Sequence, residues 1–403
     1  MHHPIKLAAI AGSLALAVTA CGTASTDKGS AASNDLKSLP AQTSIDVPAD
    51  AANPAGDGKA TCPANTTVAY IGAQTGPNAQ LGINIYNGAQ LAIDQHNKAN
   101  PGCQVKFKKF DTEGDPNKAT GPVTQATKEA DIIGVVGLPF SGESKATGNI
   151  FGQVGLVHIT PSATNPDLTK NGWTTFFRAL GNDNVQGPAA AALAEKLGAK
   201  KVYVVQDDSD YGIGLSGTAQ KALGSRLAGT DKVTTGQKDF SAVISKIINA
   251  KPDVVFYSGY YAEAAPFDQQ LVSKGYKGGF IGPDGVKDDQ FLKLAGSASN
   301  NAYFTCPCLP GELIPDFAAA YKSAFNAEPG TYSVEAYDAM TILLTGIDAG
   351  NTTREKLKTY VAGYDGQGLS KHFKWDETGE LATSTVYGYK VDNGKIVSVG
   401  TIG

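Results

Sequence analysis

Short apolar runs alternate with longer amphipathic runs over most of the chain. The run TVAYIG at 67–72 precedes a stretch at 85–99 whose apolar positions share one helical face, and DIIGVVG at 131–137 precedes another amphipathic stretch. Apolar runs of this length are typical of buried strands, and the stretches between them are typical of crossover helices. The alternation predicts a parallel sheet with helices packed against it.

A second series of the same kind begins near Asn182. KVYVVQ at 201–206 and DVVFYSG at 253–259 have the apolar character of buried strands, and an amphipathic stretch follows each of them. After Cys308 the pattern changes to consecutive helices, and the tail predicts a hairpin with an Asn-Gly turn. We therefore expect an α/β protein with two Rossmann-like lobes, each around a parallel central sheet. Lobe I is predicted to comprise residues 62–181 and 309–363, and lobe II residues 182–308 and 364–403.

Residues 1–20 have the features of an export signal. A cationic start, MHHPIK, leads into the apolar stretch LAAIAGSLALAV, which is too short for a membrane span. The small residues before Cys21, in VTACG, resemble the lipobox of bacterial lipoproteins. That resemblance implies cleavage before Cys21 and a lipid anchor on this residue, which would hold the protein at the extracytoplasmic side of the cell membrane. An ordinary cleaved signal peptide is the alternative.

Residues 21–61 consist mainly of Ala, Ser, Thr, Asp, Gly and Pro, with scarcely an aliphatic side chain. A segment of this composition cannot form a core, so the sequence predicts a flexible tether between the anchor and the folded body.

The chain is large enough for two cores, since it has 403 residues of which 41% are hydrophobic. Its net charge of -4 and the lack of a basic run argue against a nucleic-acid partner, because phosphate binding needs a concentrated cationic face. A small-molecule ligand is the expected partner.

Four cysteines remain after Cys21, and an exported protein meets oxidants, so we expect two disulfides. Cys62 and Cys103 each precede a predicted strand, and if those strands are neighbours their starts lie side by side. We predict this pair. Cys306 and Cys308 could close a small ring with each other across the proline between them. No histidine or second Cys-X-X-Cys lies near them, so a zinc site is not expected.

The stretch from Gly212 through Gly214 to Gly217 matches a dinucleotide-binding fingerprint in its spacing. In a true site the glycines follow the strand directly, whereas DDSDY separates them from the strand here. We interpret them as the start of a helix.

The string DTEGDP, with Asp111, Glu113 and Asp115, resembles the opening of a calcium loop. The bidentate glutamate that such a loop needs is replaced by Pro122. A polar cap between a strand and a helix is the better interpretation, and no metal is expected.

Nothing in the sequence indicates catalysis. There is no Gly-X-Ser-X-Gly motif, and His96, His158 and His372 lack neighbours spaced as in a triad or a metal site. His96 lies on an amphipathic face and His158 inside an apolar run, which favours structural roles.

Polar and aromatic residues follow the predicted strands of both lobes. An open α/β sheet binds its ligands at the carboxyl ends of its strands, so these loops together predict a cleft. The loops are LPFSGES, PSAT, DDSDYG, SGYYAE and PDGV.

With these loops the sequence resembles the leucine/isoleucine/valine-binding family of ABC-transporter solute receptors, which have the type I periplasmic binding-protein fold. The resemblance runs from about Val68 to the C-terminus and keeps the family's order. It implies two lobes joined by a three-segment hinge that close on a ligand, with no cofactor and no bond made or broken. The strings that carry it are GAQTGPNAQLG, NGAQLAIDQHN, DTEGDP, ITPSATNPDL, FFRALGNDNVQGP, DDSDYGIG, GQKDFSA and FIGPDGV.

The resemblance also implies where an amino acid would bind. Its carboxylate is expected at Ser141 and at the turn of Ser162, Ala163 and Thr164, and hydroxyls and N–H groups at a helix start suit an anion. Its ammonium is expected at Asp284, which replaces the usual glutamate.

Aromatic residues of lobe II, Tyr211 and Tyr260, match positions that cover the ligand in the family. Leu81 and Phe140 suggest an apolar lining, with plain loop packing as the alternative. Leu81 stands where the family often has a bulky aromatic residue, which leaves the side-chain preference of the site open.

We therefore expect a lipid-anchored extracytoplasmic receptor that captures an amino acid, branched-chain or another small apolar one, and delivers it to an ABC-transporter permease. We expect it to act as a monomer. Two alternatives share the fold: a receptor for an amide, urea or aromatic acid, and a sensor of ligand.

Overall fold

The computed structural model describes residues 40–402. The predicted signal peptide, the predicted lipidation site Cys21 and the first part of the predicted tether lie outside the described residues. Between residues 40 and 402 no helix has both the length and the apolar character that a membrane crossing needs.

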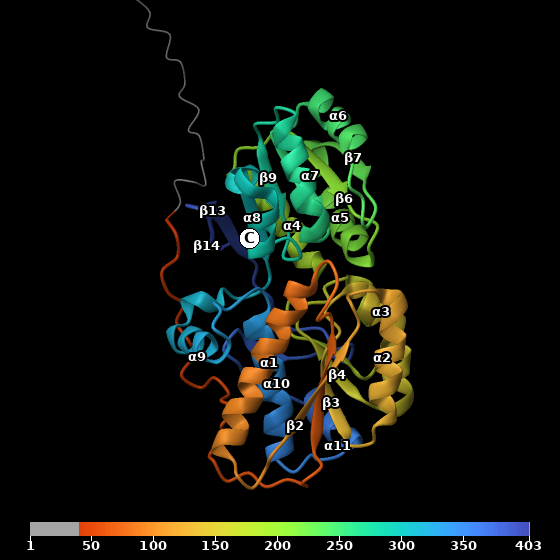
Figure 1. Cartoon of the computed structure of the whole chain (residues 1–403), viewed down its shortest axis with the longest axis vertical. Coiled ribbons are helices and arrows are strands. Elements are labelled where there is room, and N and C mark those ends of the chain that lie inside the picture. Colours follow the sequence, from red (N-terminus) through yellow and green to blue (C-terminus); the bar gives the residue numbers. More distant parts are fainter. Residues whose placement is uncertain (1–39, 403) are drawn as a thin grey trace, which may run out of the picture. The chain divides into compact units, whose positions relative to one another are not determined.

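Lobe I lies in the lower half of Figure 1. It is built on a five-stranded parallel sheet with the order β2-β1-β3-β4-β5. The central strands β1 and β3 are buried along their whole length, which agrees with their uninterrupted apolar sequences. The edge strand β2 instead carries exposed lysines, which discourage pairing with another chain. The strands are β1 (Thr67–Gly72), β2 (Lys106–Asp111), β3 (Ile132–Gly137), β4 (Val157–Thr160) and β5 (Phe176–Arg178).

Helices follow the strands of lobe I, and later segments of the chain return to cover the same sheet. The late helix α10 packs beside α1, and nearly all of its residues are buried, including residues on every side of the helix. The helices of this lobe are α1 (Ala79–Ala99), α2 (Pro116–Lys128), α3 (Ser141–Val154), α9 (Pro315–Phe325), α10 (Ser333–Asp348) and α11 (Arg354–Ala362), with short helices at Pro166–Asn171 and Gly311–Leu313 and a small ladder of β11 (Asp365–Gln367) and β12 (His372–Lys374).

Lobe II contains a seven-stranded sheet with the order β14-β13-β10-β9-β8-β6-β7. Strands β6 to β10 are parallel, and the C-terminal hairpin adds two antiparallel strands at one edge. The strands are β6 (Val202–Gln206), β7 (Leu227–Lys232), β8 (Val254–Ser258), β9 (Gly279–Gly282), β10 (Ala302–Cys306), β13 (Tyr387–Asp392) and β14 (Lys395–Thr401). The helices are α4 (Asp183–Lys196), α5 (Asp210–Leu223), α6 (Ser241–Ala250), α7 (Tyr261–Ser273) and α8 (Asp289–Ala295), with short helices at Gly224–Arg226 and Gly296–Asn301.

The turn of the C-terminal hairpin is the predicted Asn-Gly pair. Asn393 and Gly394 both have positive φ, at 50° and 73°, which is the requirement of a type I′ turn.

The chain passes between the lobes after β5, after β10 and before β13. The last crossing comes later than the sequence predicts. Gly379 O still accepts a hydrogen bond from Arg178 N of lobe I, and Ala382 N donates to Lys374 O, whereas Tyr387 already pairs in the sheet of lobe II. The predicted boundary at residues 363 and 364 is therefore wrong, because the β11–β12 ladder belongs to lobe I.

The described part of the predicted tether, residues 40–61, also differs from the expectation. Ala52 N donates to Gln367 O, and Ile45 packs on the hydrophobic core. Backbone hydrogen bonds thus hold a segment that its own composition could not fold. The tether prediction remains only for residues outside the described range.

Two disulfides are present in the described residues. Cys62 is joined to Cys103, and Cys306 to Cys308. The first ties the start of lobe I to the turn that precedes β2, and the second closes a small ring at the crossing that follows β10.

Candidate functional site

The predicted ligand residues come together where the carboxyl ends of the two sheets face each other. Phe140 and Ser141 begin α3 after β3, the Ser162–Thr164 turn follows β4, and Asp284 follows β9. The same region receives one side chain from α1 and aromatic side chains from the starts of α5 and α7. Tyr260 is partly buried, and the others are buried: Leu81, Phe140, Ser141, Ser162, Ala163, Thr164, Tyr211 and Asp284.

Asp284 lies at the centre of a hydrogen-bond cluster that joins the lobes. Its Oδ1 accepts bonds from Tyr211 Oη and from Gln186 Nε2, the latter at 2.7 Å, and its Oδ2 accepts one from Tyr332 Oη at 2.8 Å. Burial raises the pKa of Asp284, and these hydrogen bonds offset part of the rise. Because a carboxylate oxygen accepts two bonds, only Oδ2 keeps capacity for another donor.

A second buried acid, Asp183, lies close to Asp284. Burial raises the pKa of Asp183 well above its usual range, the negative charge of Asp284 raises it further, and the nearby Thr164 hydroxyl offsets part of the rise. Both carboxylate oxygens of Asp183 are buried and make no close, well-aligned hydrogen bond to a described residue. The same is true of Thr164 Oγ1 and Gln186 Oε1. The site therefore combines buried acceptor atoms with excess negative charge, which a ligand with several N–H donors and a positive charge would match.

The turn after β4 is held from within lobe I. The guanidinium of Arg178 is fully buried, donates to the carbonyls of Ala163 and Asn165, and pairs with Glu380 at 2.8 Å. Ala163 N donates to Thr160 Oγ1 at 3.0 Å. These contacts preorganise the turn before any ligand arrives.

The two serines of the expected carboxylate site make different hydrogen bonds. Ser162 Oγ donates to Pro139 O at 2.7 Å, so its proton is used to join the loops after β3 and β4. Ser141 Oγ accepts a bond from Asn165 N at 3.2 Å and keeps its own proton as a donor. Ser141 is also the first residue of α3, where the helix dipole favours an anion.

Aromatic rings also line the site. Tyr260 lies between Phe140 of lobe I, with ring centroids 4.9 Å apart, and Tyr211 of lobe II, at 5.1 Å. A Cβ on Gly285 would approach the Tyr211 and Tyr260 rings to 2.9 Å, so only glycine fits beside them. The rings form a continuous apolar wall across both lobes.

Further contacts hold the two lobes together around this cluster. Asn165 Nδ2 donates to Asp210 O at 2.6 Å, and Lys145 pairs with the carboxylate of Asp210 at 2.6 Å. On the side of α1, Asn84 Nδ2 donates to Asp288 Oδ2 at 3.1 Å. The described conformation is therefore a closed one, with the candidate site enclosed between the lobes.

A family comparison agrees with this arrangement, since the periplasmic binding protein family matches residues 65–395. The chain belongs to this family. Its relatives include the leucine-, isoleucine-, valine-, threonine- and alanine-binding protein of Pseudomonas aeruginosa, 32% identical over 81% of this chain and 90% of that one. The Leu/Ile/Val-binding protein homolog 3 of Brucella melitensis is 30% identical, over 83% of this chain and 94% of that one.

Solved structures show the same type I fold. The leucine-binding protein LivK of Thermotoga maritima aligns with a TM-score of 0.75 and 27% identity, over 84% of this chain and 99% of that one. LivJ of Streptococcus pneumoniae in complex with isoleucine aligns with a TM-score of 0.78 and 26% identity, over 83% and 99%. The prediction of fold and family is confirmed, and so is the prediction of a solute receptor in place of an enzyme.

Several residues of the candidate site were missed in the sequence. Asp183 and Gln186 lie in the string FFRALGNDNVQGP, and their spacing at the start of α4 places them on one helical face. That spacing is the signal that could have found them. Tyr332 carried no such signal, because it comes from the end of a loop and has a positive φ of 71°.

The rejected motifs have structural roles. The glycines of the dinucleotide-like string lie inside α5, and Asp115 caps α2 by accepting a bond from Asn117 N at 2.9 Å. His158 is buried against the ring of Phe151, and burial lowers its pKa to about 3. His96 and Asp348 lie near Cys103, whose sulfur is already bonded to Cys62.

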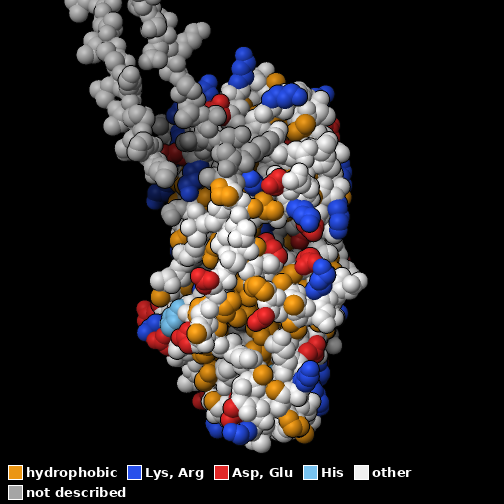
Figure 2. Space-filling model, turned by 90° about the vertical axis from the view of Figure 1, so that its left-hand side faces the viewer, with side chains coloured by type: hydrophobic (Ala, Val, Ile, Leu, Met, Phe, Trp, Pro, Cys, Tyr) orange, Lys and Arg blue, Asp and Glu red, His pale blue; other side chains and the backbone are white. Residues whose placement is uncertain are grey.

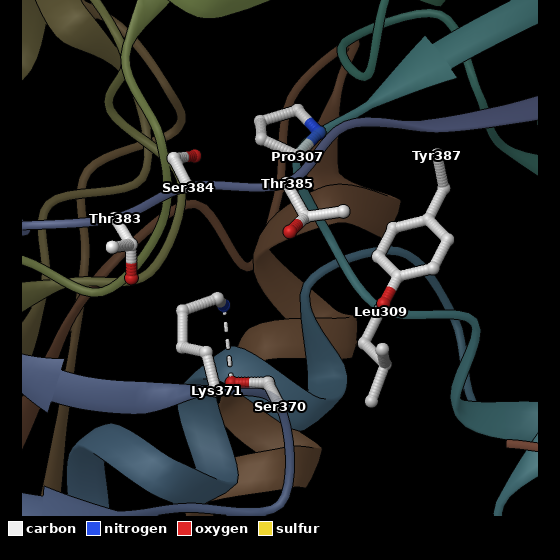
Figure 3. A pocket seen from close by; sticks show the side chains of 8 residues that line it. All are labelled: Pro307, Leu309, Ser370, Lys371, Thr383, Ser384, Thr385 and Tyr387. Carbon is white, nitrogen blue, oxygen red and sulfur yellow. Dashed lines mark hydrogen bonds between the residues drawn. The ribbon is translucent and has the colours of Figure 1, made fainter. Parts of the chain in front are cut away.

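A small cavity of about 40 Å³ lies beside the crossings between the lobes (Figure 3). Lys371 projects toward it and donates to Ser370 Oγ, to Ala179 O and to the carboxylate of Glu335. Glu335 also accepts a bond from Leu309 N at 2.8 Å. The Glu335–Lys371 pair therefore fixes the lobe I ends of the crossings. The cavity is lined by Pro307, Leu309, Ser370, Lys371, Thr383, Ser384, Thr385 and Tyr387.

Proposed function

We propose that this protein is the extracytoplasmic receptor of an ABC importer and captures a branched-chain or similarly small apolar amino acid between its lobes. The observation that carries the proposal is the pair of buried acceptor groups without a close hydrogen bond to the described residues, the Asp183 carboxylate and Gln186 Oε1, beside Asp284. Enclosed acceptors of this kind cost free energy unless a donor reaches them, and an α-ammonium supplies three N–H donors and the matching charge.

The proposed ammonium site has one acid more than the sequence predicts, since it includes Asp183 as well as Asp284. Asp284 accepts three protein hydrogen bonds and retains one acceptor position, whereas Asp183, beside the Thr164 hydroxyl, keeps most of its acceptor positions. We therefore assign the ammonium to both acids, with Asp284 also holding Tyr332 and thereby the closed state.

The carboxylate of the ligand is assigned to the start of α3 and the turn after β4. The hydroxyl of Ser141 donates there, and the α3 dipole supplies the complementary charge. Thr164 is proposed to donate its buried hydroxyl to this carboxylate. Ser162 and Ala163 act indirectly in this proposal, because their polar groups hold the turn in shape.

The apolar wall favours an aliphatic side chain on the ligand. Phe140 and Tyr260 contact each other across the cleft, and Leu81 is fully buried. The relatives named above include proteins named for binding leucine, isoleucine and valine. A branched-chain amino acid combines the polar ends and the apolar body that these residues require.

The mechanism is closure of the lobes on the ligand. A ligand that contacts Ser141 of lobe I and Asp183 of lobe II binds the closed state better than the open one, and this difference shifts the equilibrium toward closure. The closed form would then be the one recognised by the permease. Lipid attachment at Cys21 is part of the proposal and rests on the sequence alone.

The proposal is tested by thermal-shift measurements on the processed protein with each of the common amino acids. A true ligand should raise the melting temperature progressively with its concentration, and leucine, isoleucine or valine is expected to do so. Benzoate serves as a comparison, because it has a carboxylate and an apolar body without an ammonium. Stabilisation by benzoate with none by any amino acid would contradict the assignment of the ammonium site.

A further inference from the structure

The segment of residues 40–61, here called the strap, contacts both lobes. Gln42 N donates to Ser398 O at 2.8 Å, and Ser398 Oγ donates to Gln42 Oε1 at 2.9 Å. Ser398 lies in β14, the edge strand of the lobe II sheet. Ile45 N then donates to Leu313 O at 3.1 Å, which places the next contact on lobe I. The strap thus links the lobes apart from the crossings described above.

The lobe I end of the strap is fixed at several further points. Ala52 N donates to Gln367 O at 2.7 Å, and Pro54 is buried. Asn100 then bonds the strap twice, donating to Ala55 O and accepting from Ala60 N. The disulfide that follows the strap anchors its end to the same lobe. In Figure 1 the strap is the red to orange trace along the left-hand side. Figure 2 shows the molecule from that side, and apolar side chains gather there over lobe I.

The link between the lobes is short. Thr43 and Ser44 alone separate the lobe II contact of Gln42 from the lobe I contact of Ile45. A step of this length spans at most roughly 10 Å even when the backbone is fully extended. Any opening that moves β14 away from Leu313 must therefore break the contact of Gln42 or that of Ile45 once the residues between them are fully extended.

We propose that the strap is a clasp that favours the closed state of the two lobes. A contact shifts a conformational equilibrium only if it is made in one state and lost in the other, and a short link has this property. By favouring closure, the clasp raises the apparent affinity for the ligand without touching it. This inference rests on the proposed function, because the effect on closure is measured through the affinity for an amino acid.

The test is to lengthen the link without removing its contacts. In the full chain, a Gly-Ser insertion between Thr43 and Ser44 lets both contacts persist in the open state. The matched control places the same insertion between Val47 and Pro48, a stretch whose neighbouring contacts, at Ile45 and Ala52, both lie on lobe I. Binding of L-leucine is measured by calorimetry, and the radius of gyration of the ligand-free protein by small-angle X-ray scattering.

We expect the first insertion to weaken leucine binding about fivefold, the factor that corresponds to one net hydrogen bond, and to increase the radius of gyration. The control insertion should change neither quantity. Equal affinity and equal radius in both insertion variants and the parent would overturn the proposal, as would the same change in both. If the parent does not bind leucine, the proposed function fails, and the scattering comparison alone decides whether the strap favours closure.

Discussion

Tyr332 of lobe I donates its phenolic O–H to Oδ2 of Asp284 in lobe II at a distance of 2.8 Å. Both side chains are buried, and the bond exists only while the lobes are together. It therefore ties the proposed ammonium site directly to the closed conformation.

Replacing Tyr332 by phenylalanine removes this bond and keeps the ring. A hydrogen bond to a charged group contributes about 1.5–3 kcal/mol, so leucine affinity in Tyr332→Phe should fall by about 10- to 100-fold in calorimetric titration. Tyr364→Phe, which removes a phenol of lobe I that lies outside the site, is the control and should bind like the parent. An unchanged affinity in Tyr332→Phe would show that the bond does not contribute to closure.

Thr164→Val should separate binding from stability. The Thr164 hydroxyl is buried beside the Asp183 carboxylate, and an isosteric apolar side chain leaves the bond from Asp183 N to Thr164 O, at 3.0 Å, in place. Denaturant unfolding should show a stability loss of at most about 1.5 kcal/mol, the net contribution of one hydrogen bond, while calorimetry should show weaker leucine binding. Equal affinity would mean that the turn after β4 does not use this hydroxyl for the ligand.

Part of the fold and of the candidate site, including the turn after β4, can be predicted from the sequence alone. The order of apolar runs was enough to predict both sheets, because buried parallel strands have uninterrupted apolar sequences. The loops after the strands, with the family resemblance, predict Ser141, Thr164 and Asp284 as ligand residues, and the structure brings these residues into one region. The contact of Tyr332 could not be predicted, since it depends on how two segments distant in the sequence meet when the lobes close.

Lobe I ends later in the chain than the sequence predicts, and the reason is again contacts between segments distant in the sequence. Residues 364–382 have no long apolar run, and their place is fixed by contacts with residues far away in the sequence. The indole N–H of Trp375 donates to Arg178 O at 2.7 Å, and Asp338 accepts bonds from the backbone of Leu369 and Ser370. The strap is fixed in the same way, by partners that a composition argument does not contain.

Affinity for leucine should fall as the pH is lowered from neutrality. Burial raises the pKa values of Asp183 and Asp284, so both acids become protonated at a higher pH than exposed aspartates, whereas the ammonium of leucine stays charged. Protonation removes the charge that attracts the ammonium. Titrations across the acidic range should show this loss, and Asp183→Asn should bind weakly with a smaller pH dependence. A pH-independent affinity in the parent would contradict the role of both acids.

Asp268, outside the site, should limit stability at neutral and alkaline pH. It is buried, one of its oxygens has no partner, and burial raises its pKa to about 8. Between its unfolded pKa near 4 and this value the folded state binds the extra proton, so its contribution to stability decreases by about 1.4 kcal/mol for each pH unit. Asp268→Asn should therefore gain stability over the parent progressively from pH 5 to pH 8 in urea unfolding. A constant difference across this range would contradict the buried, protonated state.

The two disulfides should contribute unequally to stability. Cys62 and Cys103 are 41 residues apart in sequence, and Cys306 and Cys308 are 2 apart. Loop entropy alone predicts a loss of about 4 kcal/mol on removal of the first and about 1.6 kcal/mol on removal of the second. Paired serine variants in denaturant unfolding measure both losses. A larger loss for the Cys306 and Cys308 pair would show that its effect is not one of chain entropy.

The most direct test of the amino-acid site compares L-leucine with two fragments in calorimetric titration. 4-Methylpentanoate lacks the ammonium, and 3-methylbutylamine lacks the carboxylate, while both keep the branched apolar body. Because each loss leaves buried polar groups without a partner, at a cost of about 2–5 kcal/mol, both fragments should bind at least about 30-fold more weakly than leucine. Binding of 4-methylpentanoate as tight as that of leucine would contradict the assignment of the ammonium to Asp183 and Asp284.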